Sequence, residues 1–198
     1  MKKNIAVVAY DLNPGSSLTS DAVVIQNDLN AAGYNATLVN QWVFNEPNAA
    51  YFKNAAYWSG FDGVVICNFY GTWNLRELIL SQKPVICINS GYVDDLGLGE
   101  YLDEHISENT FHVINNTHPA MGGMALGTFT NPGAIWVDSI STFNHFVDIL
   151  VTSLANQPLL VVHKSKKLAY FGWYRMSQAG AGSVLNKLLV STAKWAFS

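Results

Sequence analysis

The feature that most constrains this chain is a set of four short runs of apolar, largely β-branched residues. The runs span residues 5–9, 36–39, 63–67 and 84–88, and helical patterns separate them at residues 20–32, 47–58 and 73–82. Runs without polar alternation are typical of strands that are buried on both faces of a parallel sheet. Strand–helix–strand alternation then predicts an α/β fold, a three-layer, flavodoxin-like, doubly wound and mostly parallel sheet with helices on both faces.

The second half of the sequence is richer in strand patterns. The candidate strands are residues 111–114, 134–137, 159–162 and 168–173, and a closing helix is expected over 181–197. The polar segment 163–167 (HKSKK) separates the last two strands, which predicts an antiparallel hairpin near the C-terminus. With 198 residues the chain has the length of one ordinary domain, so we expect a single α/β domain over 1–198.

The charge balance excludes one large class of function. Charged residues make up 13% of the chain and the formal net charge is −3, which leaves no basic surface of the kind that nucleic acids require. The first apolar run is shorter than a signal-peptide core, and no run approaches the roughly 20 residues of a membrane-spanning helix. We therefore expect neither a nucleic-acid nor a membrane partner, and a chain that is cytoplasmic or assembled into a particle.

Several segments share motifs with one protein family. Residues 83–92 (KPVICINSGY) have the form of a strand and nucleophile elbow, and residues 116–123 (NTHPAMGG) that of an HP…G segment. The opening strand, loop and helix, which end in AAGYNATLV, and the final strand LAYFGWY with its terminal helix complete the set. Together they resemble the class I glutamine amidotransferase-like superfamily, in its trehalose-utilisation-type branch. The resemblance implies that family's fold over nearly the whole chain, with a helix behind the elbow and a ligand crevice at the carboxyl ends of the parallel strands.

The positions that carry glutaminase chemistry in that family differ here. Alignment of residues 84–91 places Asn89 where the family has its nucleophilic cysteine, and Cys87 falls two positions earlier, inside the strand. Where the family ends its last strand in Phe-His-Pro-Glu, this chain has FGWY, with Gly172 and Tyr174 in place of the base and its orienting carboxylate. The leading hypothesis is a catalytically inactive amidotransferase-like domain that acts as a structural or protein-interaction module. A component of a larger assembly, such as a virus particle, would suit the composition.

A second hypothesis keeps chemistry in the crevice, in a hydrolase or a small-ligand-binding protein. Ser90 would then be the nucleophile and His118 its base, which requires the two side chains to lie within roughly 3 Å of each other. The residues expected to face a ligand are Asp11, Asn68, Asn89, Ser90, His118 and Tyr174.

An aromatic cluster within residues 42–58 predicts a protein interface. One helix stripe cannot cover six large rings, so part of the cluster is expected to face a protein partner or a second copy of the chain. The candidate interface residues are Trp42, Phe44, Tyr51 and Phe52, and Tyr57 and Trp58 complete the cluster.

Cysteine and histidine usage predicts neither a cofactor nor a metal. We expect Cys67 and Cys87 to be buried as small hydrophobic side chains, with a redox pair as the alternative. His105, His112 and His118 lack the i, i+4 spacing of zinc ligands. No metal site is therefore expected.

Overall fold

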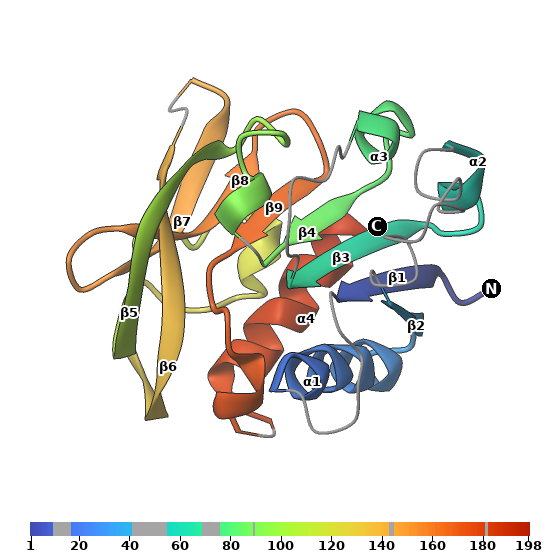
Figure 1. Ribbon diagram of the computed structural model, residues 1–198. Helices are drawn as coiled ribbons and strands as arrows, with labels where there is room; N and C mark the ends of the chain where they lie inside the picture. Colours follow the sequence, from blue (N-terminus) through green and yellow to red (C-terminus); the bar gives the residue numbers. More distant parts are fainter. Residues whose placement is uncertain (10–16, 41–54, 69–75, 89, 143–144, 181) are drawn as a thin grey trace.

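The computed structural model describes residues 1–198 except 10–16, 41–54, 69–75, 89, 143–144 and 181. In this described part, nine strands form one sheet in the order β2-β1-β3-β4-β9-β8-β7-β5-β6 (Figure 1). The strands are β1 (Asn4–Ala9), β2 (Asn35–Asn40), β3 (Gly63–Asn68), β4 (Val85–Cys87), β5 (Gly99–Val113), β6 (Gly127–Thr142), β7 (Val147–Ser153), β8 (Pro158–His163) and β9 (Leu168–Phe171). The helices are α1 (Ser17–Ala31), α2 (Ala55–Trp58), α3 (Arg76–Leu80) and α4 (Val184–Ala196), and the 3₁₀ turns are η2 (Ser90–Tyr92), η3 (Pro119–Met121) and η4 (Met176–Gln178).

The parallel half of the sheet consists of β2, β1, β3, β4 and β9. β1 pairs with β2 on one side and with β3 on the other, and β4 joins β3 to β9, all in parallel. The side chains of residues 5–9 and 64–67 are almost completely buried, which explains why these runs lack polar alternation. The predicted parallel arrangement of the four apolar runs is confirmed.

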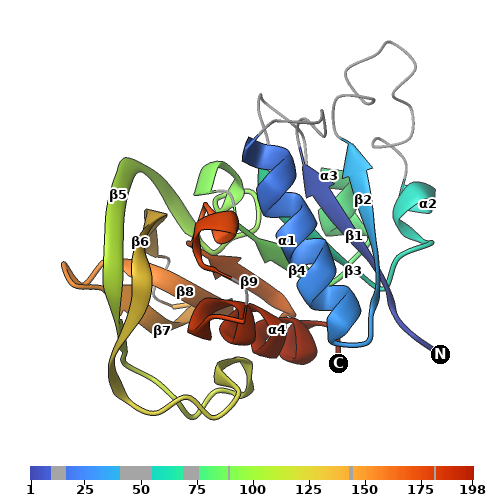
Figure 2. The ribbon, with the colours of Figure 1, turned by 90° about the horizontal axis from the view of Figure 1, so that it is seen from below.

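Helices cover both faces of the parallel half, as the sequence predicts. α1 and α4 lie together on one face (Figures 1 and 2), where Ile25, Leu29 and Leu189 enter one core cluster. α2 and α3 lie on the opposite face, where Trp58 and Leu78 enter a second core cluster. In the part of the chain that the structure describes, no helix combines the length and the apolar character needed to cross a membrane.

The two cysteines belong to opposite faces of the sheet. Cys67 packs in the core cluster beneath α1 and α4, whereas Cys87 packs in the cluster on the other face. Both are free thiols with almost no exposed surface. Burial, and then the negative charge of Asp21, raise the pKa of the Cys67 thiol. Opposed side chains cannot be bridged without moving the backbone, so the geometry favours two inert core residues over a redox pair.

The antiparallel half of the sheet is larger than predicted. β8 pairs with β9 in antiparallel fashion, which confirms the predicted hairpin near the C-terminus. β7, β5 and β6 continue the antiparallel pairing. β5 and β6 are much longer than the predicted strands at 111–114 and 134–137, and the sequence pattern does not predict β7 at all. The pairing of β5 with β6 is irregular at two places, and many residues of β6 are exposed, so neither strand keeps the alternation that would reveal its length.

The segment after β4 corrects the expectation of a helix behind the elbow. Ser90 begins the 3₁₀ turn η2, and turns continue through Gly97, whose φ of +70° lies in the left-handed region. The chain therefore leaves the elbow without an α-helix, and no helix dipole supports the residue that follows β4.

Candidate functional site

The candidate site lies at the carboxyl ends of the central parallel strands. β3 ends at Asn68, Ser90 follows β4 and Tyr174 follows β9, so these three predicted ligand-facing residues come to one edge of the sheet, as expected for this fold. The side chain of Asn68 is not among those described, and Asp11 and Asn89 lie outside the described residues.

The carboxylate of Asp138, from β6, lies at the centre of the site. Asp138 is only 2% exposed. The hydroxyl of Ser90 donates a hydrogen bond of 3.0 Å to its Oδ2, and Nδ1 of His105 lies 2.5 Å from its Oδ1. Burial raises the pKa of Asp138, and the contacts with His105 and Ser90 oppose that rise. One buried carboxylate thus joins the turn after β4 to the β5–β6 hairpin.

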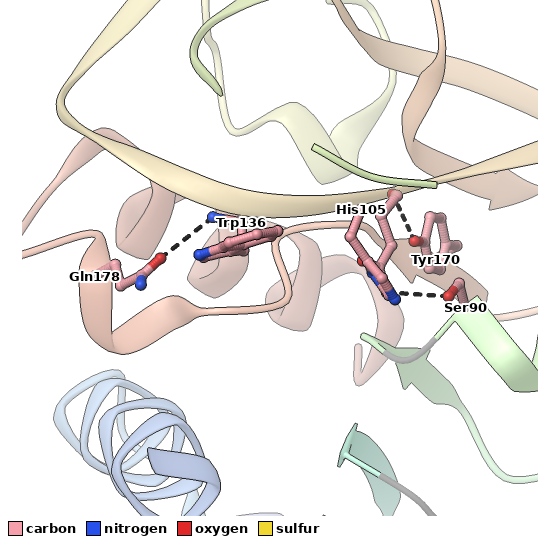
Figure 3. A network of polar contacts seen from close by, with 6 residues as sticks. Ser90, His105, Trp136, Tyr170 and Gln178 are labelled. Atoms are coloured by element: carbon pink, nitrogen blue, oxygen red, sulfur yellow. Dashed lines mark hydrogen bonds and ion pairs between the residues drawn. The ribbon is translucent and has the colours of Figure 1, made fainter. Parts of the chain in front are cut away.

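The backbone of β6 is also attached to the segment that follows β9. The Asp138 amide donates to the carbonyl of Gly172 at 2.9 Å, and the Tyr170 hydroxyl donates to the carbonyl of Asp138 at 2.7 Å. The Trp136 amide donates to Oε1 of Gln178 at 3.2 Å (Figure 3). These bonds place β6 across the point where β9 ends. They also give hydrogen-bond acceptors to the amides of Trp136 and Asp138.

An irregularity in the β5–β6 pairing brings His105 to the buried carboxylate. Tyr101 pairs with Ile140, but the next pair is His105 with Asp138, so β5 advances four residues while β6 advances two. Regular pairing would set Asp103 opposite Asp138. The two extra residues in β5 therefore replace a carboxylate by an imidazole at the position facing Asp138, a role typical of strand bulges beside functional sites.

Sequence reasoning missed this centre, although the sequence carries a signal for it. Asp138 is a lone charge within the apolar stretch 134–140 (AIWVDSI). Such a residue, once buried, requires hydrogen-bonding partners. The identity of the partners could not be read from the sequence, because His105 is 33 residues away and Ser90 is 48 residues away.

Aromatic and charged side chains lie next to His105. The ring of Tyr174 is 6.0 Å from the imidazole, and the guanidinium of Arg175 lies 5.0 Å from the centre of the same tyrosine ring. Arg175 contacts the buried carboxylate of Asp21 at 3.3 Å, and Ser177 donates its backbone amide to that carboxylate at 2.8 Å. Asp21 of α1 thus fixes the segment that carries Tyr174 and Arg175.

The predicted partnership of Ser90 with His118 is not found. Nδ1 of His118 accepts a hydrogen bond from the Ala120 amide at 3.2 Å, which caps η3, and the imidazole packs 4.9 Å from the ring of Trp195. Trp195 is near the end of α4, and its carbonyl accepts from Lys167, the residue just before β9. His118 therefore lies toward the amino ends of the parallel strands, at the edge opposite to Ser90.

The environment of His118 suits a structural role. Burial lowers the pKa of its imidazole; the negative charge of Asp148 opposes this, and the nearby Lys167 adds to it. An imidazole that caps a 3₁₀ turn and packs on a tryptophan fixes the loop that carries it.

The predicted interface residues lie outside the described residues: Trp42, Phe44, Tyr51 and Phe52. Of the same aromatic cluster, Trp58 is buried in the core and packs edge-on against Tyr57, with ring centres 5.2 Å apart. Part of the cluster is thus core, and the interface role of the remainder stays a prediction.

A separate cavity lies at the opposite edge of the sheet, where the parallel strands begin. It has a volume of about 620 Å³ and is lined by residues that include Leu80, Lys83, Asp95 and Lys166. These residues surround the amino ends of β4 and β9, away from Asp138. Within the described ranges, no three His, Cys, Asp or Glu side chains gather as a metal site would require.

Comparison with solved structures identifies the fold. A ThuA-like protein from Bacteroides uniformis aligns over 98% of this chain and 91% of its own, with a TM-score of 0.73 and 12% sequence identity. A glutamine amidotransferase from Thermotoga maritima aligns over the full length of both chains, with a TM-score of 0.59 and 9% identity. The glutaminase domain of Trypanosoma brucei CTPS, solved with bound acivicin, covers 98% of this chain and 94% of its own, with a TM-score of 0.55 and 11% identity.

These similarities are structural only. No protein-family model matches the sequence, and neither does any curated protein. The chain therefore has the α/β, flavodoxin-like fold shared by ThuA-like proteins and class I glutamine amidotransferases, at identities too low to carry over an activity.

The close approach of β6 to Gly172 yields a first prediction. A Cβ at this position would lie 2.6 Å from the carbonyl oxygen of Asp138 and 3.1 Å from that of Leu159. We expect Gly172→Ala to lower the free energy of unfolding by about 1–3 kcal/mol, measured by urea denaturation, because backbone must move to admit the methyl group. In β6, Gly133 has open space around its Cβ direction, so Gly133→Ala is the matched control with a change within about 0.5 kcal/mol. Equal losses of unfolding free energy in the two variants would contradict the close approach of β6 to Gly172.

The raised pKa of Asp138 yields a second prediction. Because burial raises the folded-state pKa of Asp138 above the usual range of an aspartate, the stability contributed by this group is complete below that range and is lost as the pH rises through the folded pKa. Asp138→Asn removes this titratable group. Relative to this variant, the wild type should lose stability as the pH rises above about 4, measured by urea denaturation at each pH. A difference between the two proteins that does not change with pH would contradict the assignment.

Proposed function

We propose that this chain is an amidotransferase-like domain without glutaminase activity that acts as a structural or protein-interaction module. The observation that carries the proposal is the lack of space at Gly172, which takes the position of the family's catalytic histidine. With two carbonyl oxygens within 3.1 Å of its Cβ direction, no imidazole fits there while β6 lies across the end of β9. In this proposal β6 occupies the place that the base of a glutaminase relay would need.

The remaining relay groups support the same proposal. Cys67 and Cys87 are both buried in the core, so neither thiol can act as an exposed nucleophile. Ser90 is 2% exposed and donates its hydroxyl to Asp138. Its proton is thus directed to a carboxylate that is itself shared with His105, and not to an imidazole base.

Exposed apolar side chains on the antiparallel half of the sheet support an interaction role. Trp136, Phe146 and Leu154 are all exposed large hydrophobic residues. With charged residues at 13% of the chain, a partner could cover such a surface with little loss of ion hydration. A component of a larger assembly, such as a virus particle, is the form of this role that the composition favours.

The absence of glutaminase activity can be tested directly. Purified protein incubated with glutamine should release no ammonia above a buffer blank, with an active class I glutaminase as the positive control. Asn89→Cys should remain inactive, because a thiol without a base stays largely protonated near neutral pH. Ammonia release by the wild type that disappears in Cys87→Ala or Ser90→Ala would overturn the proposal.

The interaction role predicts association in solution. Sedimentation velocity should show an oligomer or a complex with a protein partner, with an interface of roughly 1,000 Å² or more. Trp42→Ala and Phe44→Ala should each weaken the assembly without changing the circular dichroism spectrum. Leu80→Ala, which removes an exposed side chain from α3, is the matched control and should leave the assembly unchanged. A protein that stays monomeric at high concentration and binds nothing would contradict this role.

A second candidate function has one observation in its favour. An imidazole and a hydroxyl share the buried carboxylate of Asp138 at the edge where this fold binds its ligands. A hydrolase or a small-ligand-binding protein at this crevice would use the group of Ser90, His105 and Asp138 in place of the predicted pair of Ser90 and His118.

A further inference from the structure

We infer that His105, oriented by Asp138, is the proton-transfer residue of a site that hydrolyses esters with water as the nucleophile. This inference rests on the second candidate function and names its base, its positioning residue and its substrate class.

The geometry of the pair is that of a carboxylate-oriented imidazole. Nδ1 of His105 lies 2.5 Å from Oδ1 of Asp138, and the side chains are 45% and 2% exposed, respectively. A buried carboxylate that accepts Nδ1–H fixes the ring's orientation and tautomer, so Nε2 becomes the nitrogen that exchanges a proton with a ligand. The buried member positions the exposed one, which is the arrangement that general acid–base catalysis uses.

A purely structural role explains this arrangement less well. Ion pairs and polar groups in buried positions contribute little net stability compared with apolar residues of similar size. Here every polar atom of Asp138 has a partner: its amide bonds Gly172, its carbonyl bonds Tyr170, and its carboxylate bonds Ser90 and His105. Two extra residues in β5 then bring the imidazole, and not another carboxylate, to this point. Holding one side chain by this many bonds is typical of a group whose direction matters.

Aromatic and charged groups next to His105 could contact the ester. The Tyr174 ring lies 6.0 Å from the imidazole and 5.0 Å from the guanidinium of Arg175. The ring can pack against the acyl or alcohol portion of a small ester, and Arg175, whose charge also acts on Asp138, adds positive charge near the site. Asp21 binds Arg175 at 3.3 Å, which offsets that charge, so the site suits a neutral ester better than a free acid.

The proposed step balances without a further reactant. Nε2 of His105 takes a proton from a water molecule as the water oxygen bonds to the ester carbonyl carbon. The tetrahedral intermediate then collapses, the bond from carbon to the alcohol oxygen breaks, and the imidazolium returns its proton to the leaving alkoxide. Ester and water become acid and alcohol, and Ser90 stays a positioning residue because its hydroxyl is donated to Asp138.

The test uses p-nitrophenyl acetate with the full chain, and release of p-nitrophenolate is followed by absorbance. His105→Gln should lower the protein-catalysed rate at least about fivefold. His145→Gln removes an exposed histidine elsewhere and should leave the rate unchanged. Circular dichroism establishes that both variants are folded. Equal losses in the two variants, or an acetyl group found on Ser90 by mass spectrometry, would overturn the inference.

A second measurement separates positioning from a structural role. NMR of the imidazole nitrogens reports which tautomer His105 holds. In the wild type Nδ1 should carry the proton, and in Asp138→Asn that preference should be lost and the rate should fall, because the ring loses the carboxylate that accepts its Nδ1–H. A rate that the variant leaves unchanged, or a fall in rate with the Nδ1–H tautomer kept, would contradict the inference. The ammonia assay and sedimentation test the proposed function independently of either result.

Discussion

The approach of β6 to the end of β9 is the contact on which the rest of this structure depends. The Asp138 amide can reach the Gly172 carbonyl at 2.9 Å because position 172 has no side chain. This approach buries the Asp138 carboxylate and brings the β5–β6 hairpin over the carboxyl edge of the parallel strands. One backbone contact therefore assembles the polar group of Ser90, His105 and Asp138 at this edge.

The parallel half of the fold could be predicted because its signal is local. Strands buried on both faces need continuous apolar runs, and such runs are visible in the sequence at residues 5–9 and 63–67. β5, β6 and β7 could not be predicted to the same extent. Their exposed residues and the two irregular pairings of β5 with β6 follow from contacts between distant segments, so no single period marks them.

The candidate site shows the same division between local and distant information. The topology placed Ser90 and Tyr174 at the carboxyl edge as predicted, because each follows the end of a parallel strand. The motif resemblance predicts His118 at that edge too, but β5 carries the chain to the opposite edge before residue 118 is reached. The true neighbour of Ser90 is Asp138, which only the folded hairpin brings near. A shared fold with glutaminases therefore says little about which side chains meet at this edge.

The irregular pairing of β5 has a consequence for how such a site can evolve. In a regular ladder Asp103 would pair with Asp138, whereas the two additional residues of β5 make His105 its partner. A slip of β5 by two residues over this stretch would thus exchange the partner of a buried acid without any substitution. Among relatives of this chain, a change in the register of the hairpin would be a more direct route to new chemistry than a change of residue type. Alignments compare residues and not strand register, so they would overlook that route.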